Sequence, residues 1–356
     1  MHVLTLKLII GDCMNPTSET SNKAENIDIA VRVIEKVTGY MFQAALRAAV
    51  KLNIAEYLKD GPKTSQELAE IINGKPKVIH KTLRILTTQG IFKIQDDLHF
   101  ALTPEAEFLL PDHPYSLRQA ILMLTDKTFW MPIHNLDEII LGKPVFKNMF
   151  GGTFFEYWQK NVHLPDNFDV GMSSMSRIEN EYVINAYQFP ENIVIADIAG
   201  GLGALLFEVL KRNPTTKGIL FDQPHVLKQT ILPLLGDDSR WTTYPGSFFE
   251  KCPEADIYLL KYITHDWPED SVINILKTIR RAMKTTSKLL LIDCIVADDN
   301  KVNIGNDIDL ICLSLSPEGG EHTISEFETL LSNADLKLNR IIDTHCHIHI
   351  LEAIPI

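Results

Sequence analysis

A glycine-rich turn between a predicted strand and a predicted helix is the feature that most limits the folds open to this chain. Residues 197–203 have the sequence Asp-Ile-Ala-Gly-Gly-Leu-Gly, between a β-rich run at 193–196 and an amphipathic run at 204–212. Glycines at such a turn let the backbone bend sharply and approach a ligand at the helix N-terminus. Asp222 ends the next predicted strand, where a carboxylate can accept hydrogen bonds from ribose hydroxyls. This pattern predicts an adenosine-cofactor site, and by itself leaves a dinucleotide and other adenosine cofactors open.

The part of the chain after residue 190 predicts an α/β fold of the Rossmann-like type, doubly wound around a mostly parallel sheet. Short β-rich runs alternate here with helical runs. An alternation of this kind places strands in parallel, with helices on both faces of the sheet. Strands are expected at 193–196, 218–221, 256–260 and 288–292, helices at 204–212, 223–234 and 270–283, and two closing strands at 336–342 and 345–351.

The N-terminal part predicts a mainly helical module with a winged-helix pattern. Apolar residues recur at helical spacing from 27 to 58, and two further helices and a β-hairpin at 91–102 follow. The second helix has its cap at Thr64 or Ser65, and the third opens at Lys75-Pro76. We therefore divide the chain into a flexible leader (1–26), a winged-helix domain (27–111), a helical connecting region that lines a substrate pocket (112–189) and a catalytic domain (190–356).

The composition argues against several classes of protein. The 356 residues include 34 Lys and Arg against 46 Asp and Glu, and the net charge of −12 speaks against nucleic acid as the main partner. The longest uncharged apolar runs are shorter than the ~20 residues that span a membrane, so no membrane partner is expected. The five cysteines are widely spaced and form no Cys-x-x-Cys pair, which indicates reduced thiols and a cytoplasmic protein.

His265 is the residue best placed to act as a catalytic base. It follows the predicted strand at 256–260, and ligands of doubly wound folds bind at the carboxyl ends of the strands. Histidine is well suited to proton abstraction near neutral pH. Asp293 ends the neighbouring strand, so we expect its carboxylate to lie against the imidazole and raise its basicity. Glu321 follows further along, after a Gly-Gly pair.

These segments together resemble the S-adenosylmethionine-dependent O-methyltransferases of the caffeate and hydroxyindole type. The matching segments are 197–203, 221–226, 246–249, 260–267, 291–293, 318–323 and 326–327, in the family's order, and the separation of His265 from Asp293 is also that of the family. Segments 155–158 and 168–176 resemble the parts that line the substrate, and the winged-helix domain is a dimerisation module in that family. The resemblance covers about residues 27–356.

The resemblance implies an enzyme that transfers a methyl group to a hydroxyl of a small aromatic molecule and releases S-adenosylhomocysteine. It implies a homodimer and no metal. His265 is then the general base, with Asp293 and Glu321 orienting it. The implied cofactor-binding residues are Asp197, Gly201, Gly203, Asp222, Ser247, Phe248, Lys261 and Ser176. The implied substrate-binding residues are Trp130, Met172, Met175 and Phe155.

Four positions depart from the family pattern. Ala199 replaces a glycine, Ser247 stands in place of an acid, Asp293 is one methylene shorter than the usual Glu, and His322 replaces an Arg. None of these removes the base or the ribose-binding acid. The alternative hypothesis is a member of the same family whose scaffold has been reused for decarboxylation, hydroxylation or pericyclic chemistry.

Two weaker patterns favour other functions. A basic winged-helix surface would suit DNA, although the overall charge opposes this. Its basic residues are Lys63, Lys75, Lys77, Lys81, Arg84 and Lys93. His345, His347 and His349 alternate, which on a strand would place them on one face as in a zinc site.

Overall fold

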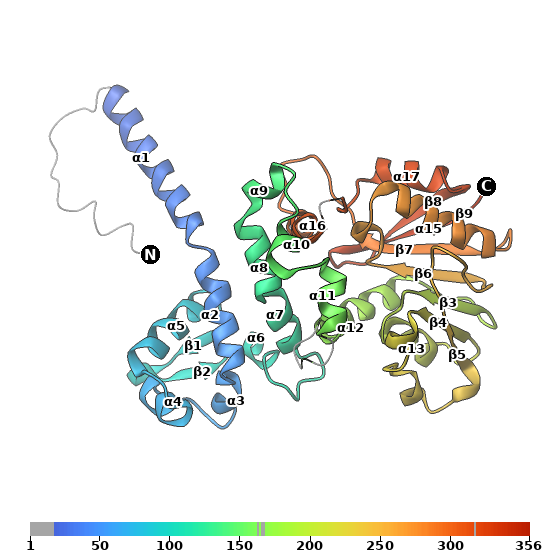
Figure 1. Cartoon of the computed structure of the whole chain (residues 1–356). Helices are drawn as coiled ribbons and strands as arrows, with labels where there is room; N and C mark the ends of the chain where they lie inside the picture. Colours follow the sequence, from blue (N-terminus) through green and yellow to red (C-terminus); the bar gives the residue numbers. More distant parts are fainter. Residues whose placement is uncertain (1–17, 162–163, 165–167, 317) are drawn as a thin grey trace.

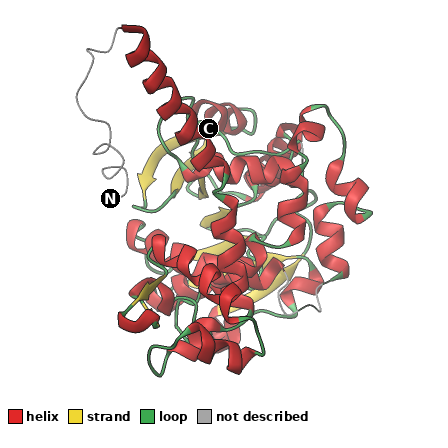
Figure 2. Cartoon of the chain, turned by 90° about the vertical axis from the view of Figure 1, so that its left-hand side faces the viewer, coloured by secondary structure: helices red, strands yellow, loops and turns green. Residues whose placement is uncertain are grey.

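The computed structural model describes residues 18–161, 164, 168–316 and 318–356. An N-terminal helical module, a middle group of helices and a C-terminal sheet follow one another across the molecule (Figure 1). Within the described residues, no helix combines the length and the apolar character needed to cross a membrane. The two views show that the first helix, α1 (Ser18–Val37), projects beyond the rest of the chain (Figures 1 and 2).

The N-terminal module has the predicted winged-helix pattern. Its elements are α2 (Tyr40–Lys51), α3 (Ile54–Leu58), α4 (Ser65–Ile72), α5 (Pro76–Thr88), and the antiparallel strands β1 (Phe92–Ile94) and β2 (Phe100–Leu102). Thr64 caps α4 as expected, because its side chain accepts from the Glu67 amide while the Glu67 carboxylate accepts from the Thr64 amide. Leu83 and Leu86 of α5 pack against both strands in a closed core.

Two expectations for this end of the chain were wrong in detail. The single helix expected from 27 to 58 is three helices, interrupted at Gly39 and at Asn53, which has a φ of +54°. Residues 18–26, expected to belong to a flexible leader, are helical in α1, whose Glu, Lys and Ala residues favour helix. Residues 1–17 of that leader lie outside the described residues.

The middle group of helices surrounds an aromatic cluster. Its members are α6 (Pro104–Glu107), α7 (Arg118–Leu124), α8 (Lys127–His134), α9 (Leu136–Ile140), α10 (Val145–Phe150), α11 (Phe154–Lys160) and α12 (Phe168–Ala186). Met123, Phe129, Phe146, Phe154 and Trp158 are buried together. The long helix α12 contacts α7 at one end of this group and α13 (Ala204–Arg212) beside the sheet, so it connects the two.

The C-terminal part is a seven-stranded sheet in the order β5-β4-β3-β6-β7-β9-β8. The strands are β3 (Val194–Ile198), β4 (Lys217–Asp222), β5 (Trp241–Pro245), β6 (Ile257–Lys261), β7 (Lys288–Cys294), β8 (Leu336–Asp343) and β9 (Ile348–Pro355). Strands β3 to β7 are parallel, whereas β9 is antiparallel to both β7 and β8. The predicted doubly wound α/β fold is therefore confirmed.

The sheet differs from the sequence expectation in two elements. Edge strand β5 was not expected. The helix expected at 223–234 is only the short α14 (Pro224–Leu227) followed by a 3₁₀ turn at Leu232–Leu235. Pro233 lies in that turn, and a proline cannot donate the amide hydrogen that a continuing helix needs.

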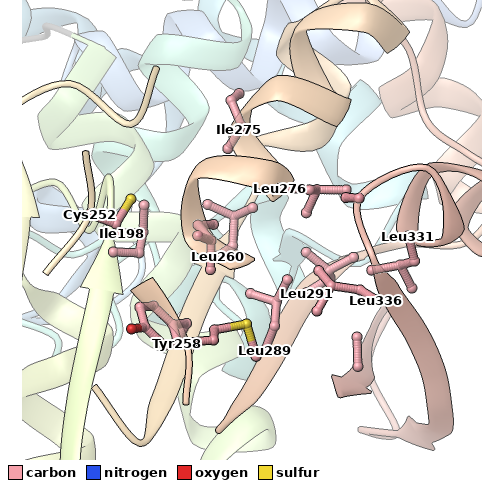
Figure 3. Close-up of a cluster of buried hydrophobic side chains, with 14 of the residues drawn as sticks. Ile198, Cys252, Tyr258, Leu260, Ile275, Leu276, Leu289, Leu291, Leu331 and Leu336 are labelled. Carbon is pink, nitrogen blue, oxygen red and sulfur yellow. The ribbon is translucent and has the colours of Figure 1, made fainter. Parts of the chain in front are cut away.

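Both faces of the sheet are covered by apolar side chains. On one face, residues of the strands pack under α15 (Glu269–Ala282) and α17 (Ile324–Ser332), where Tyr258, Leu260 and Leu276 are fully buried (Figure 3). Ile257 and Leu259 point to the other face, as alternation along a strand requires, and pack in the core formed with α12 and α13. The sheet is thereby held as a rigid layer between two apolar cores.

A buried carboxylate joins the C-terminal strands. Glu352 in β9 accepts hydrogen bonds from Tyr187, Lys288, Asn339 and Arg340, at distances of 2.7–3.0 Å. Burial alone would raise the pKa of Glu352, but these hydrogen bonds outweigh burial and lower the pKa to about 2.

Glu352→Gln tests this network by removing the charge while keeping the shape. We expect the variant to be less stable than the wild-type protein at neutral pH by ~2 kcal/mol, as for hydrogen bonds to a charged group. Because the folded-state pKa lies below the ordinary 4.5, the charge stabilises the fold above that pH, and its contribution is lost as the pH falls towards 2. Thermal melting from neutral to acid pH should show a shrinking difference between the two proteins. A difference that stays constant would contradict this account.

Candidate functional site

The candidate site lies at the carboxyl ends of four neighbouring parallel strands. The glycine-rich turn follows β3, Asp222 ends β4, His265 follows β6, and Asp293 is the next-to-last residue of β7. Because β4, β3, β6 and β7 are adjacent in the sheet, residues far apart in the sequence meet at one edge.

The glycine-rich turn has a backbone that few side chains tolerate. Ala199, Gly201 and Gly203 all have positive φ, at +54°, +58° and +84°. No atom lies within 4 Å of where a Cβ of Gly201 would be, so the backbone here is open to a ligand. The Gly201 amide donates to Asp222 Oδ2 at 2.8 Å, which fastens the turn to the end of β4. The glycine-rich turn and Asp222, which the sequence analysis assigned to one site, are therefore adjacent in the structure.

Asp197 is a buried carboxylate with an unused acceptor. It is 2% exposed, and its Oδ2 has no hydrogen-bond partner. Burial raises the pKa of Asp197 to about 7, and burial also raises the pKa of Asp222. Gly200 must be a glycine because a Cβ there would lie 2.5 Å from the Asp197 carboxylate. A ligand with hydroxyl or amino donors would satisfy the unpartnered oxygen of Asp197, which fits a polar group of an adenosine cofactor.

Lys261 is held by side chains of α12. Its Nζ donates to Glu179 Oε2 at 2.6 Å, Ser176 Oγ at 3.1 Å and Asn180 Oδ1 at 3.1 Å. Ser176 and Lys261, both predicted cofactor residues, are thus brought together. Burial would raise the pKa of Glu179, but Lys261 and His347 outweigh it and lower the pKa to about 2. Sequence reasoning missed Glu179, since one acid within a helix carries no local signal.

Ser247 and Phe248 follow β5, next to the end of β4. The Gly246 amide donates to the Asp222 carbonyl oxygen at 3.1 Å, which brings this turn to Asp222. The ring of Phe248 meets Trp267 edge to face, with centroids 5.9 Å apart. Both predicted residues therefore lie near Asp222, and their contact with an adenine stays a prediction.

His265 is paired with Glu321 rather than with Asp293. Its Nδ1 and Glu321 Oε1 are 2.7 Å apart, and His265 is 7% exposed. Because a carboxylate only accepts, Nδ1 carries the hydrogen in the neutral ring and Nε2 keeps the lone pair. Burial would lower the pKa of His265, but Asp266, Glu321 and Asp293 outweigh it and raise the pKa to about 10. The three carboxylates therefore favour the protonated ring in the ligand-free chain.

Asp293 does not form the expected contact with the imidazole. Its Oδ1 accepts from the Tyr262 amide at 2.9 Å and its Oδ2 from Thr264 Oγ1 at 3.0 Å. Tyr262 has a φ of +56°, and this unusual turn exposes an amide that the short Asp side chain reaches. Asp293 therefore fixes the turn that carries His265, and Glu321 supplies the direct hydrogen bond.

Two glycines allow Glu321 to reach the imidazole. A Cβ on Gly319 would lie 2.2 Å from the carbonyl oxygen of His265, and the Gly320 amide donates to that same oxygen at 2.8 Å. The Glu321 amide donates to Asp309 Oδ1 of α16 (Ile304–Leu315) at 2.8 Å. The Gly-Gly pair noted in the sequence thus lets the loop pass close to the His265 backbone, and this positions Glu321.

The four predicted substrate residues are distributed over three helices. Met172 and Met175 of α12 pack against the sheet core, and Met172 also packs against the aromatic cluster. Phe155 of α11 is 42% exposed, and its ring lies edge-on to Phe154. Trp130 of α8 is half-buried. Within the residues that the structure describes, no hydrogen bond, ion pair or ring contact joins any of them to His265, so their binding of an acceptor stays a prediction.

The histidines near the C-terminus do not gather as the zinc hypothesis required. Strand β9 begins only at Ile348, because His345 takes a φ of +64° in the preceding turn. His345 is exposed beside Asp343, whereas His347 Nε2 lies 2.9 Å from the hydroxyl of Tyr262. The expected alignment of three rings on one strand face is therefore wrong.

Comparisons with known proteins give the same assignment for both halves of the chain. Residues 134–337 match the O-methyltransferase domain family, and residues 34–112 match the O-methyltransferase dimerisation domain family. A phenazine O-methyltransferase of Lysobacter antibioticus is 31% identical over 94% of this chain and 99% of its own. A mitomycin biosynthesis 6-O-methyltransferase of Streptomyces lavendulae is 33% identical over 83% and 86%. A solved methyltransferase of calicheamicin biosynthesis, in its S-adenosylhomocysteine-bound form, is 30% identical, with a TM-score of 0.86 over 93% of this chain and 99% of its own.

Ala199→Gly should stabilise the protein. An L-residue in the left-handed region costs ~1–2 kcal/mol, and a glycine there costs ~0.5–1 kcal/mol in chain entropy, so a net gain of ~0.5–1 kcal/mol is expected. Thermal melting measures it. Gly200→Ala is the matched control, and it should lower the melting midpoint because its Cβ meets the Asp197 carboxylate. A lower midpoint for Ala199→Gly would contradict the strain.

Proposed function

The chain belongs to the O-methyltransferase family, and we propose that it uses S-adenosylmethionine to methylate a hydroxyl of a small aromatic molecule, with His265 as the general base. The family and the activity class expected from the sequence are thereby confirmed. The observation that carries the proposed mechanism is the buried hydrogen bond between His265 and Glu321, formed at the same strand edge as the glycine-rich turn.

The cofactor supplies a sulfonium methyl group that leaves without acid or metal assistance. Asp222 binds the ribose hydroxyls and the Gly201 backbone lies alongside the ligand, as the open space at Gly201 supports. Asp197 uses its unpartnered Oδ2 to accept a hydrogen bond from the bound cofactor. Lys261 and Ser176 act together, since they already share a hydrogen bond between β6 and α12.

The protein's own chemical task is to hold the acceptor oxygen in line and remove its proton. Nε2 of His265 takes that proton, and the Glu321 carboxylate stabilises the imidazolium that forms. Asp293 acts as a positioning residue, because it holds the 262–264 backbone turn and Thr264.

A flat, apolar acceptor suits the helices that face the site. Met172, Met175 and Trp130 offer polarisable and aromatic surface, and the related enzyme named for phenazine acts on a flat aromatic molecule. The Phe155 side chain is 42% exposed, so a planar acceptor could pack against its ring.

The functional unit is a homodimer assembled through the dimerisation domain. Helix α1 presents large apolar side chains to solvent: Ile27, Ile29, Val31, Val33, Ile34 and Val37 are 44–67% exposed. A helix that projects with this much apolar surface needs a covering partner (Figure 2). A second copy of the chain provides one, since the matched dimerisation domain begins within α1.

A pair of variants separates the base from the cofactor site. His265→Gln should lower kcat by ~10²–10⁴-fold, as for loss of a general base, and leave the affinity for S-adenosylhomocysteine unchanged. Asp222→Asn should do the reverse and weaken the cofactor by ~10–100-fold, the loss of a charged hydrogen bond. Calorimetric titration with S-adenosylhomocysteine and turnover with phenolic acceptors measure the two effects. Loss of cofactor binding in His265→Gln would show that His265 is misplaced.

Charges on α1 should separate the homodimer. We expect the wild-type chain to sediment as a dimer and the double variant Ile34→Glu, Val37→Glu to sediment as a monomer, because both side chains are about two-thirds exposed in a single chain. Analytical ultracentrifugation measures this, with Lys36→Glu as a control for added charge alone. A double variant that stays dimeric would exclude α1 from the interface.

A further inference from the structure

His265 and Glu321, the hydrogen-bonded pair of the candidate site, lie beside a third side chain of a type that binds metal ions, Cys312. His265, Cys312 and Glu321 each offer one ligand atom, and these three atoms lie within 4.8 Å of one another. The side chains come from the 3₁₀ turn Thr264–Asp266, from α16 and from the loop after α16. In the part of the chain that the structure describes, this is the one gathering of three such side chains. Proton transfer by His265 makes no use of the thiol.

Glu321 has an acceptor that the protein leaves unsatisfied. Its Oε1 is engaged by His265, whereas its Oε2 is buried without a hydrogen-bond partner, and the side chain has 0% exposure. A buried acceptor left unpaired costs ~1–3 kcal/mol, so this oxygen favours a ligand that carries positive charge.

The surrounding charge also favours a cation. Asp266 Oδ1 lies 3.7 Å from His265 Nε2, and Asp293 is fully buried close by. Three carboxylates therefore face a single imidazole. A divalent cation bound here would lie among three carboxyl groups, whose ionised forms attract positive charge.

Hydrogen bonds connect the three backbone segments that carry His265, Cys312 and Glu321. Asp309 lies one turn before Cys312 on the same face of α16, and its Oδ1 accepts from the Glu321 amide at 2.8 Å. The Gly320 amide donates to the carbonyl oxygen of His265, also at 2.8 Å. These bonds fasten the backbone segments of all three ligands to one another, as a preorganised site requires.

The donor set matches one class of metal ion. Thiolate sulfur with imidazole nitrogen and a carboxylate oxygen is a ligand set of Zn²⁺, and three protein ligands leave its fourth position open. Bond lengths of ~2.0–2.3 Å place zinc ligands ~3.5 Å apart, so the atoms must approach by about 1 Å.

We propose that His265, Cys312 and Glu321 bind a thiophilic divalent cation of the Zn²⁺ type and that the bound ion stops turnover. The metal–sulfur bond replaces the S–H bond of Cys312, whose proton goes to solvent, and no group is oxidised or reduced. Because Glu321 faces Nδ1, the metal binds that nitrogen in place of its hydrogen, the ring hydrogen then lies on Nε2, and Nε2 can no longer take the acceptor's proton. The block of turnover rests on the proposed function, whereas the binding of the ion does not.

Cobalt serves as the probe, because Co²⁺ takes the same ligands as Zn²⁺ and is coloured. The metal-free, full-length protein is titrated with Co²⁺ in thiol-free buffer. We expect one ion per chain, with a near-ultraviolet thiolate-to-cobalt charge-transfer band that Zn²⁺ abolishes. Cys312→Ser should lose the band. Cys346→Ser is the matched control and should keep it, since Cys346 Sγ lies 3.2 Å from His347 Nδ1 and is the competing thiol–imidazole pair.

The proposal is overturned if the wild-type protein gives no such band, if the band survives in Cys312→Ser, or if Cys346→Ser loses it. Cys312→Ala should also lose the band. The melting midpoint of each variant shows whether the variant is still folded. In a second arm, Zn²⁺ should inhibit the wild-type enzyme at least ~10-fold more strongly than Cys312→Ser, and equal inhibition would refute the blocking role. The band is read without turnover, so an error in the proposed function leaves the binding test intact.

Discussion

The hydrogen bond between His265 Nδ1 and Glu321 Oε1 joins a strand end to a loop 56 residues later, inside a region almost closed to solvent. Burial penalises the imidazolium, and the nearby carboxylates of Asp266 and Asp293 more than reverse that penalty. The balance favours the imidazolium, and in the neutral ring the lone pair is on Nε2, since Nδ1 faces Glu321. The neighbouring geometry serves this pair: Asp293 holds the turn before the imidazole, and Gly319 leaves room for the loop that brings Glu321.

The parallel sheet explains why such distant residues can meet. Adjacent strands end at one edge, and cores on both faces hold them in register, so the turns after β3, β4, β6 and β7 form a continuous surface. Helix α12 extends this surface towards the middle helices. The ion pair between Glu179 of α12 and Lys261 of β6 fixes that helix against the strand that precedes His265. The carboxyl edge of the sheet, where the cofactor is proposed to bind, is therefore held against α12, one of the helices predicted to bind the acceptor.

The sequence predicted the interior of the sheet well, because buried parallel strands are short apolar runs that end in glycine or acid. The sequence analysis did not predict the edge strand β5 (Trp241–Pro245). This strand is largely exposed and contains no apolar run that would indicate a buried strand. The site was predicted as a set of residues, but not as a set of contacts. The partner of His265 depends on side-chain length and on the turn at Tyr262, and Glu179 acquires its role only when α12 packs against β6. Such tertiary contacts leave no periodic signal in the chain.

The central claim is that this strand edge presents a methyl donor to the imidazole of His265. The most direct measurement is a crystal structure of the homodimer with S-adenosylhomocysteine bound. The account predicts that the ribose hydroxyls lie on the Asp222 carboxylate and that the sulfur atom faces His265 Nε2, with room for one acceptor oxygen between them. A complex in which the ligand lies away from Asp222, or in which the sulfur is turned from His265, would contradict it.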